Sequence, residues 1–485
     1  MVKVEDKTSM KVPHVAVLSS LGMGHVIPLL ELAKCLVVHH HCHVSFLNIT
    51  TEASAAQNEL LHSPGTLPPG LHVIDLPPVD ISSLVSDETP IVSRLSINLQ
   101  ESLSYSLKSV LIELGKLQAL VIDLFCSQAF EISKDLSVPT YSFCTASAAF
   151  LALSLYLPGL DREVECEFID LESIQVPNCA PVRIEDLAEE VRNRKADDFK
   201  WLLLHFSRLP MATRIFLNSW EDLEPVSLKA IREHSFYHQI PTPKICAIGP
   251  LIKHDDVAMT EADVECQAWL DKQPLDSVLL IALGSGGTLT AAQLTELAWG
   301  LELSRQRFIL VARKPTDASA SGMFFNVGGD VNDPKAYLPE GFLERTKGVG
   351  LVLPSWAPQL MVLRHPSTGA FISHCGWNSI LESISHDVPM ITWPLYAEQR
   401  MNATMLVEEV GVAVKLTGGP EKGNIVGREV IERVIRMVMK GDEGKMMRDR
   451  AGELKDSAQK ALSFGGSSYE SLSCVVEEWK KKIMP

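Results

Sequence analysis

The sequence contains no long apolar run and no paired-cysteine motif. Its longest apolar candidate, residues 146–157, is interrupted by serines and followed by Pro158. It is therefore shorter than the roughly 20 apolar residues that a transmembrane helix needs. The 10 cysteines include no C-x-x-C pair, which is typical of reduced thiols rather than of a disulfide framework or a zinc site. We expect no transmembrane segment.

Basic residues are also few. The chain has 44 Lys and Arg against 60 Asp and Glu, and its formal charge of −16 argues against a nucleic-acid partner or an anionic membrane surface. Residues 1–11 are polar, and the apolar stretch after them is typical of a strand rather than of a secretory signal. With 46% hydrophobic and 21% charged residues, the composition is that of a soluble globular enzyme. We expect a cytoplasmic protein.

Simple metal motifs are missing as well. No two aspartates have D-x-D spacing, the simplest arrangement for holding a metal-bound diphosphate. The histidine-rich run 39–43 lies where a helix is expected to turn into a strand, and five adjacent residues rarely converge on one ion. A surface turn is the favoured interpretation of this run, and we predict no metal and no cofactor.

Each half of the chain opens with the same unit: a short apolar strand, a small-residue turn and a helix. In the first half, strand 14–20 leads through Gly22-Met23-Gly24 into helix 25–36. In the second half, strand 278–284 leads into the turn 285–288 and another helix. This pattern indicates a doubly wound α/β fold, and 485 residues exceed what one hydrophobic core usually serves.

Two Rossmann-like domains are therefore expected. Prolines and exposed charges in the stretch 241–265 indicate a linker, and residues 318–333, rich in Gly, Ser and Asp, indicate a surface loop. Ser467 or Ser468 would cap a last helix. The predicted segments are an N-terminal domain at 1–245, a linker at 246–262, a C-terminal domain at 263–464 and a final helix within 465–485. The other strand candidates are 43–49, 118–124, 214–218, 307–312, 369–373 and 388–393.

The stretch 356–399 concentrates indole, amide, imidazole, hydroxyl and carboxylate groups around one helix start. A strand candidate runs into His374, and a helical pattern follows Asn378 and Ser379. A helix start offers unpaired backbone N–H groups and the positive end of a dipole. We therefore expect an anionic diphosphate there, with these three side chains as donors. Cys375, inside the same motif, is expected to be a buried small hydrophobe.

His25 is the best candidate for a general base. It lies where the first glycine turn meets a helix, and the positive end of the helix dipole favours a neutral imidazole that can accept a proton. Asp123 ends a strand candidate and could approach His25 at the carboxyl edge of the sheet, where ligands collect in such folds. It would orient the ring and stabilise the imidazolium. Taken alone, a histidine in a strand-to-helix loop is more often structural.

The run 356–399, from WAPQ to AEQ, resembles the signature box of plant UDP-sugar-dependent glycosyltransferases without insertion or deletion. Members of that family also carry a catalytic His after G-M-G and an Asp before L-F, which correspond to His25 and Asp123. The resemblance covers nearly the whole chain. It implies the GT-B fold, in which two Rossmann-like domains face each other across a cleft, and a final helix that returns to the N-terminal domain.

The resemblance also implies a role for each matched residue of the donor site. The uracil would contact Trp356 and Gln359, the ribose Glu382, the diphosphate His374, Asn378 and Ser379, and the sugar Trp377, Glu398 and Gln399. Ser285 and Gly286 would touch the phosphates, and Ala357, Gly376 and Tyr396 complete the donor-binding set. A final Gln usually accompanies glucose in this family, so Gln399 indicates UDP-glucose as the donor.

The acceptor is harder to infer. The closest resemblance is to the branch that glucosylates small phenols, monolignols and flavonoids, but Leu21, Cys126 and Leu283 depart from the residues common there. These departures bear on the identity of the acceptor rather than on glycosyl transfer. The candidate acceptor residues are Ser20, Gly24, Phe125, Phe143 and Phe150, and each phenylalanine could equally belong to the core.

The implied reaction is a single in-line displacement that converts an α-linked donor into a β-glucoside, with His25 as the base. A phenolate also carries negative charge on ring carbons, so O-linked and C-linked products both stay open. A nicotinamide-dependent oxidoreductase is an alternative, although the third glycine of G-x-G-x-x-G would fall at Ile27. A non-catalytic binder is another, but it would be expected to lose His25 and Asp123. We expect a monomer whose partners are UDP-glucose and an aromatic acceptor.

Overall fold

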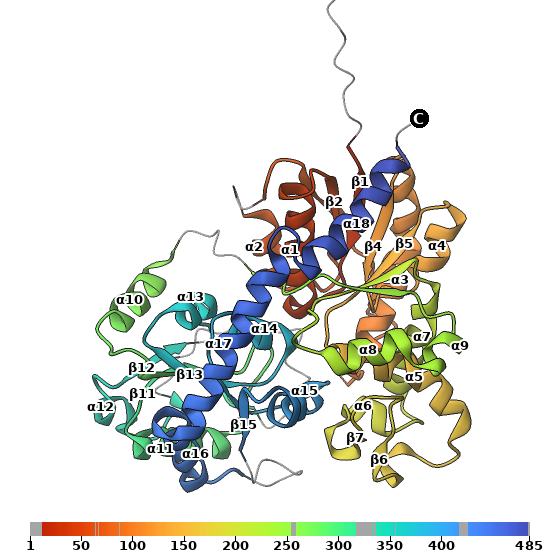
Figure 1. Ribbon diagram of the computed structural model, residues 1–485. Helices are drawn as coiled ribbons and strands as arrows, with labels where there is room; N and C mark the ends of the chain where they lie inside the picture. The colour runs from red at the N-terminus through yellow and green to blue at the C-terminus, as the bar shows by residue number, and fades with distance from the viewer. Residues whose placement is uncertain are drawn as a thin grey trace, which may run out of the picture.

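The computed structural model describes residues 12–483 except 64, 66, 87, 254–258, 317–332, 334–335, 355 and 417–424. It shows two α/β lobes, each built on a parallel sheet (Figure 1). The N-terminal lobe contains β1 (His14–Leu18), α1 (Met23–Val38), β2 (His43–Ile49), α2 (Ala55–His62), β3 (Leu71–Leu76), α3 (Ile91–Glu113), β4 (Ala119–Asp123), α4 (Ala129–Asp135), β5 (Thr140–Cys144), α5 (Ala148–Glu163), β6 (Ser173–Ile174), β7 (Val182–Arg183), α6 (Glu189–Arg192), α7 (Asp197–Arg208), β8 (Arg214–Leu217), α8 (Pro225–Glu233), α9 (Ser235–Gln239) and β9 (Lys244–Ala247).

The C-terminal lobe follows in the same style. It contains α10 (Glu261–Leu270), β10 (Val278–Ala282), α11 (Ala291–Ser304), β11 (Arg307–Ala312), α12 (Phe342–Arg345), β12 (Gly350–Pro354), α13 (Gln359–Arg364), β13 (Thr368–Ser373), α14 (Trp377–Ser385), β14 (Met390–Thr392), α15 (Gln399–Met405), β15 (Ala413–Lys415), α16 (Arg428–Lys440) and α17 (Asp442–Leu462). The last helix, α18 (Ser467–Lys481), packs on the N-terminal lobe. None of the helices in the described part of the chain is long and apolar enough to span a membrane.

Strand order determines where each sheet can bind a ligand. The first sheet has the order β3-β2-β1-β4-β5-β8-β9, and the second has β12-β11-β10-β13-β14-β15. In each sheet the order reverses next to the first strand, between β1 and β4 and between β10 and β13. The loops after such strands open apart at the carboxyl edge, which is where ligands bind in doubly wound folds. His25, Asp123, Ser285 and His374 all follow or end these strands.

All the predicted strands are present. The predicted bounds of β2 and β11 match the structure, and β1, β4, β8, β10, β13 and β14 differ from prediction by a few residues at their ends. The strands β3, β5, β6, β7, β9, β12 and β15 were not predicted. Several are short, and β3 mixes exposed and buried side chains, so a search for buried apolar runs overlooks them.

The last helix begins differently from the prediction. Its N-cap is Gly466, without a side-chain cap, rather than Ser467 or Ser468. The Ser468 hydroxyl is used elsewhere, because it donates a 2.6 Å hydrogen bond to the carbonyl of Gly249 in the N-terminal lobe. The cap prediction was therefore wrong, and a tertiary contact explains why.

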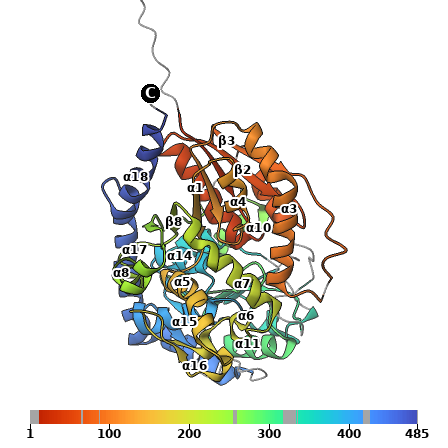
Figure 2. The ribbon, with the colours of Figure 1, turned by 90° about the vertical axis from the view of Figure 1, so that its right-hand side faces the viewer.

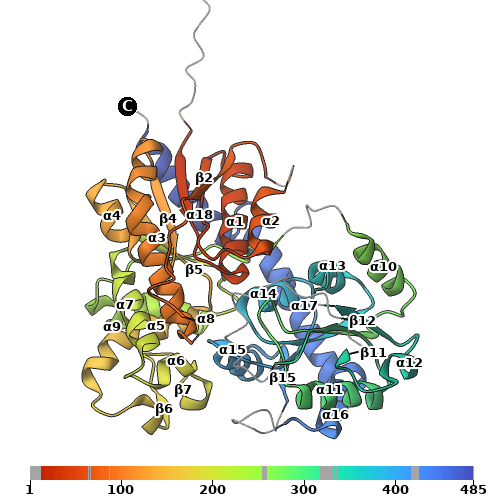
Figure 3. The same cartoon turned by 180° about the vertical axis from the view of Figure 1, so that it is seen from behind.

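Helices α17 and α18 connect the two lobes. The views of Figures 1, 2 and 3 show α17 along the C-terminal lobe and α18 against the N-terminal sheet. Trp479 of α18 is fully buried in the core formed with β1, β2 and α1, and its Nε1 donates a 2.9 Å hydrogen bond to the Tyr141 hydroxyl. In the other direction, Trp220 follows β8 yet packs into the C-terminal core. The core of each lobe therefore includes a tryptophan from outside the predicted bounds of that domain.

The connection between the lobes falls between β9 and α10, where residues 254–258 lie outside the described part of the chain. The predicted loop 318–333 also lies outside it, apart from Asp333. The exact domain boundaries stay a prediction.

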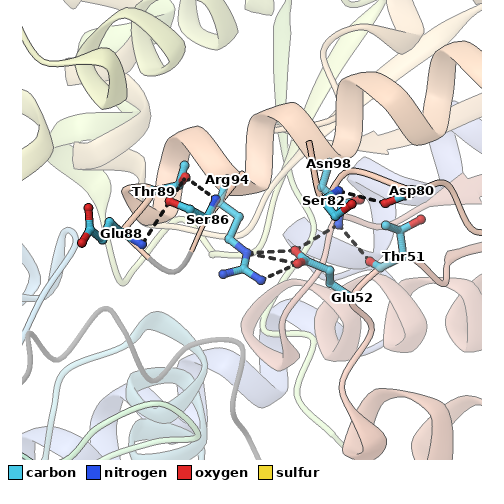
Figure 4. Close-up of polar contacts among 9 residues, drawn as sticks. All are labelled: Thr51, Glu52, Asp80, Ser82, Ser86, Glu88, Thr89, Arg94 and Asn98. Atoms are coloured by element: carbon cyan, nitrogen blue, oxygen red, sulfur yellow. Dashed lines mark hydrogen bonds and ion pairs between the residues drawn. The ribbon is translucent and has the colours of Figure 1, made fainter. Parts of the chain in front are cut away.

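A polar network fixes the rim of the N-terminal sheet (Figure 4). Arg94 of α3 donates to both carboxylate oxygens of Glu52, at 3.1 Å from Nε, and Asn98 Nδ2 donates to the Thr51 carbonyl at 2.9 Å. Glu52 has a φ of 57°, a left-handed backbone conformation that residues other than glycine rarely adopt. The network therefore holds the loop after β2 in this turn and ties it to α3, beside the carboxyl edge of the sheet.

Candidate active site

The first functional cluster forms around His25, in the first turn of α1. Gly22, with a φ of 93°, lets the chain turn sharply from β1 into this helix. Nδ1 of His25 lies 2.8 Å from Oδ2 of Asp123, which is fully buried at the end of β4. The other carboxylate oxygen accepts a 3.0 Å hydrogen bond from the backbone N–H of Phe125. Because Nδ1 faces the carboxylate, Nε2 is the ring nitrogen available to a substrate.

The pKa of His25 is raised above 6.5. Burial of the ring is the largest single effect and acts to lower the pKa. The charge of Asp123, its hydrogen bond and the charge of Glu398 together outweigh burial. The sequence argument from the helix dipole predicted the opposite bias, toward the neutral ring, and that prediction was wrong. A direct carboxylate contact is stronger than the field of a helix end.

Two other side chains contact the imidazole. Thr145 Oγ1 lies 3.1 Å from Nδ1, and the Phe125 ring meets the imidazole edge-on with 5.4 Å between centroids. Ser20, two residues after β1, is also fully buried, and its hydroxyl has no hydrogen-bond partner among the described residues. A buried hydroxyl without a partner is costly, so a ligand or water at this edge would stabilise it.

The second cluster forms where β13 runs into α14. Cys375 has a φ of 64°, a left-handed conformation that is found in non-glycine residues mainly at functional sites. Gly376 is the N-cap of α14, without a side-chain cap, so the first backbone N–H groups of the helix have no partner within it. Cys375 is itself fully buried, which confirms its prediction as a small hydrophobe. This helix start is a ready anion-binding position.

His374 is packed tightly between two glycines. A Cβ on Gly284 would lie 2.5 Å from Nε2 of His374, and one on Gly376 would lie 2.4 Å from it, so only glycine fits at either position. Burial, together with the positive charge of Arg313, lowers the pKa of His374 to about 4. Nδ1 is buried with no hydrogen-bond partner among the described residues. At neutral pH His374 can therefore offer a hydrogen bond to a phosphate but no positive charge.

A third group of residues is suited to a nucleoside. Gln359, at the start of α13, donates from Nε2 to Ser379 Oγ at 3.0 Å and to Glu382 Oε2 at 2.5 Å. Trp356 is 53% exposed, which is high for an indole, whereas Ala357 beside it is buried. An open aromatic face has the chemistry to stack on a base, and the Glu382 carboxylate has the chemistry to bind ribose hydroxyls.

Glu398 and Gln399 meet at the start of α15. The Gln399 side-chain oxygen accepts hydrogen bonds from the backbone N–H groups of Leu395 and Tyr396, at 2.8 and 3.1 Å, so its orientation is fixed. Burial raises the pKa of Tyr396 beside it. Burial also raises the pKa of Glu398, although His25 acts to lower it.

Trp377 differs from its expected place. Its indole is buried in the C-terminal core, and Nε1 donates a 2.7 Å hydrogen bond to the carbonyl of Asn218. The sugar contact implied for Trp377 cannot come from this side chain. Only its backbone, in the first turn of α14, remains available for a ligand.

The clusters face each other across the boundary between the lobes. Asn378 Nδ2 donates to the carbonyl of Gly24 at 3.1 Å, which joins the starts of α14 and α1. Ser147 Oγ donates to Asn402 Oδ1 at 3.3 Å. The electrostatic effect of Glu398 on His25 crosses the same boundary. The candidate base and the candidate anion site therefore belong to one cleft.

The predicted acceptor residues divide into two groups. Phe143 is fully buried in the core with β1, α1 and α18, so its assignment to an acceptor pocket is corrected. Phe125 and Phe150 are only partly buried. A Cβ on Gly24 would meet nothing within 4 Å, so the space beside it is open. The acceptor roles of Ser20, Gly24, Phe125 and Phe150 stay predictions.

Sequence reasoning missed three polar residues of the cleft: Thr145, Arg313 and Asn402. Arg313 directly follows β11, and its Nη1 donates to the Ser285 carbonyl in the turn after β10. Thr145 directly follows β5. A polar residue immediately after a buried strand was the available signal for these two. Asn402 lies one helical turn after Glu398 and donates to it at 3.4 Å.

Metal ligands are not assembled in the described part of the chain. No group of three His, Cys, Asp or Glu side chains there could hold an ion. The histidine-rich run 39–43 forms the turn between α1 and β2.

Comparison with known proteins places this geometry in a family. Residues 325–440 match the model of the family described as UDP-glucoronosyl and UDP-glucosyl transferase. An anthocyanidin 3-O-glucosyltransferase from Manihot esculenta is 42% identical, over 97% of this chain and 96% of its own length. A hydroquinone glucosyltransferase from Rauvolfia serpentina is 43% identical, over 97% of this chain and 98% of its own.

A solved structure shares the whole architecture. The crystal structure of TcCGT1 in complex with UDP superposes with a TM-score of 0.90 and 45% sequence identity, covering 97% of this chain and 100% of that one. At this identity and coverage, the two proteins are alike in sequence as well as in fold, over nearly the whole of this chain.

Proposed function

Because the chain belongs to the plant UDP-glycosyltransferases, which are enzymes of the GT-B fold, we propose that it is an inverting UDP-glucose-dependent glucosyltransferase acting on phenolic or flavonoid acceptors. The observation that carries this proposal is the 2.8 Å contact between His25 and Asp123, facing the start of α14 across one cleft. The relatives give no support to a nicotinamide-dependent oxidoreductase or a non-catalytic binder.

His25 acts as the general base in this proposal. Its Nε2 takes the proton from the acceptor hydroxyl as the acceptor oxygen attacks the anomeric carbon. Asp123 holds Nδ1 and stabilises the imidazolium that forms, the role that a buried Asp plays in serine hydrolases. The raised pKa of His25 makes the ring a stronger base than free imidazole.

UDP departs from the opposite face of the sugar. The bond between the anomeric carbon and the diphosphate oxygen breaks as the new bond forms, so the α-linked donor gives a β-linked product and no covalent intermediate is needed. The negative charge that develops on the diphosphate is met by the backbone N–H groups at the start of α14 and by a hydrogen bond from His374. These dipoles are fixed in place before the reaction.

Glucose is proposed as the transferred sugar. Support comes from Gln399, whose side chain is held by two backbone N–H groups beside Glu398. A Gln399→His variant is expected to lose at least about tenfold in kcat/KM for UDP-glucose relative to UDP-galactose, because the imidazole presents different donors to the sugar hydroxyls. Unchanged donor selectivity, measured with both sugar nucleotides, would count against glucose recognition by this residue.

A phenol is proposed as the acceptor. The relatives from Manihot esculenta and Rauvolfia serpentina are named for an anthocyanidin and for hydroquinone, and both substrates are phenols. A phenolate carries charge on its oxygen and on its ortho and para carbons, so the same base serves O-linked and C-linked transfer. In the C-linked case, the attacking ring carbon then loses its proton to the phenolate oxygen through solvent, which restores the aromatic ring and the phenol. The outcome depends on which atom lies near the anomeric carbon.

The test is a mass-resolved assay of the purified protein. UDP-glucose is incubated with hydroquinone and a panel of flavonoids in the presence of EDTA, and a gain of one hexose is expected. Resistance of the product to acid hydrolysis identifies a carbon linkage. Donor binding without any product would refute the proposed acceptor class, and absence of UDP-glucose binding would refute the whole proposal.

A His25→Ala variant isolates the base. Turnover is expected to fall about 10²- to 10⁴-fold while UDP-glucose binding is retained, because the base acts on the acceptor. His62→Ala is the matched control, since His62 also pairs with a carboxylate, at 3.2 Å from Asp75, but lies on the surface. Loss of activity in both variants would indicate a general defect instead.

Three further properties belong to the proposal. The enzyme is expected to need no metal or other cofactor, to be monomeric and to reside in the cytoplasm. Full activity in EDTA, a monomer mass by light scattering and the distribution of a fluorescent fusion test these in turn.

A further inference from the structure

Arg313 lies at the carboxyl edge of the C-terminal sheet. It directly follows β11, the neighbour of β10, and its side chain is partly buried. Nη1 donates a short hydrogen bond to the carbonyl of Ser285, in the turn after β10. Its charge acts on His374, after β13, and on Tyr396, after β14. Arg313 thus lies within electrostatic reach of three neighbouring strand ends.

Arg313 supplies a positive charge that the other described candidate donor-site side chains at this edge lack. The low pKa of His374 leaves that ring neutral, and Asn378 and Ser379 are neutral donors. Glu382 and Glu398 are acidic. Among these described side chains, Arg313 is the one that brings a positive charge toward an edge where a diphosphate has to bind.

We propose that Arg313 is the residue that counters the negative charge of the UDP diphosphate, from the side of β11, opposite the start of α14. It does so by its own charge and by holding the Ser285 turn in place through the carbonyl contact. The inference rests on the proposed UDP-sugar donor and adds a residue to the donor site.

Arginine is well suited to this position. Its planar guanidinium carries five N–H donors and can contact more than one acceptor, of which the Ser285 carbonyl is one. Burial lowers the pKa of Arg313, but an arginine retains its proton at neutral pH. A fixed charge in a partly buried cleft also acts more strongly than one on the surface.

The experiment compares ligands with and without phosphates. Binding of UDP and of uridine is measured by calorimetry for the wild type, Arg313→Gln, Arg313→Lys and Lys314→Gln. Lys314 is the matched control, because it is the next residue, carries the same charge and is exposed. Arg313→Gln is expected to weaken UDP binding about 10- to 100-fold and uridine binding less than about twofold. Arg313→Lys should recover part of the loss, and Lys314→Gln should change little.

Each outcome decides the matter. Equal losses of UDP and uridine in Arg313→Gln would show a merely structural role, and an unchanged affinity for UDP would overturn the proposal. If Arg313→Gln does not fold, the Arg313→Lys variant provides the test, because the loss must again be larger for UDP than for uridine. If the wild type fails to bind UDP, the proposed function itself fails, which is a distinguishable result.

Discussion

His25 and His374 each lie near the point where the strand order of their lobe reverses, yet their protonation equilibria are shifted in opposite directions. Each lies at a strand-to-helix junction. The pKa of His25 is raised, because Asp123 and Glu398 outweigh the effect of burial. The pKa of His374 falls to about 4, because burial is reinforced by Arg313.

The comparison teaches that the neighbouring charge, not the fold position, assigns the chemical role. A ring paired with a buried carboxylate is suited to take up a proton. A ring packed between glycines, with a cation nearby, stays neutral and is suited to donate a hydrogen bond. The two lobes repeat one architecture and use it for a base on one side and an anion site on the other.

Asp123→Asn is expected to break the comparison most severely. The amide cannot stabilise an imidazolium and can hold the wrong tautomer of His25, so kcat should fall about 10³-fold or more. UDP-glucose binding should be nearly unchanged. Asp75→Asn is the control, since it alters an exposed His–Asp pair. A kcat within tenfold of the wild type would show that Asp123 does not support the base.

Gly376→Ala is expected to disturb the His374 side of the comparison. The added Cβ would lie 2.4 Å from Nε2, so the ring has to move from the edge. Affinity for UDP should fall about 10- to 100-fold, as measured by calorimetry, with a smaller effect on uridine. Gly452→Ala, where a Cβ meets nothing within 4 Å, is the control. Unchanged affinity for UDP would mean that the ring position is unimportant.

The pH dependence of kcat/KM should distinguish the two rings. A base works only when deprotonated, so activity should fall about tenfold per pH unit below the pKa of His25, which lies above 6.5. In the Asp123→Asn variant, the residual activity should fall at a lower pH than the activity of the wild type does. An acid limb at pH 4 to 5 in the wild type would contradict the assignment of His25 as base.

The same shifts contribute to stability with opposite signs. The contribution of His25 is fully present below pH 6.5 and is lost as the pH rises through its raised pKa. The contribution of His374 is present above pH 6.5 and is lost as the pH falls toward about 4. Urea unfolding of the wild type and of each His→Gln variant across this range checks both directions.

The smallest effect is expected away from both rings, at the polar contact between the lobes. Arg183 pairs with Glu408 at 2.6 Å, and both side chains are more than one-third exposed. Arg183→Gln should change unfolding free energy by no more than about 1 kcal/mol and kcat/KM by less than about threefold. Lys200→Gln, which breaks an exposed pair within α7, is the control. A tenfold loss would make this contact part of domain closure.

Much of the fold and part of the site could be predicted from the sequence. Val, Ile, Leu and Phe dominate β2 and β11, so their bounds were predicted. His25 and Asp123 follow or end two central strands, and the rule for parallel sheets was enough to bring them together.

The remaining features depend on contacts between residues that are far apart in the sequence, and no local sequence pattern reveals such contacts. Glu398 acts on His25 from the other lobe, and the Trp377 indole bonds a carbonyl of the N-terminal lobe. The neutrality of His374 follows from its burial and from Arg313, which lies on another strand. Each of these results from tertiary contact, so sequence reasoning could name candidate residues but not their electrostatic states.

The crossing of α18 has a consequence for the order in which the protein is made. The core beneath the N-terminal sheet includes Trp479 and its neighbours on α18, which the ribosome adds only after the entire C-terminal sheet. An apolar face of the lobe that is translated first therefore stays uncovered until the last helix has been made. Completion of the base-bearing lobe is thereby tied to synthesis of the lobe that carries the anion site.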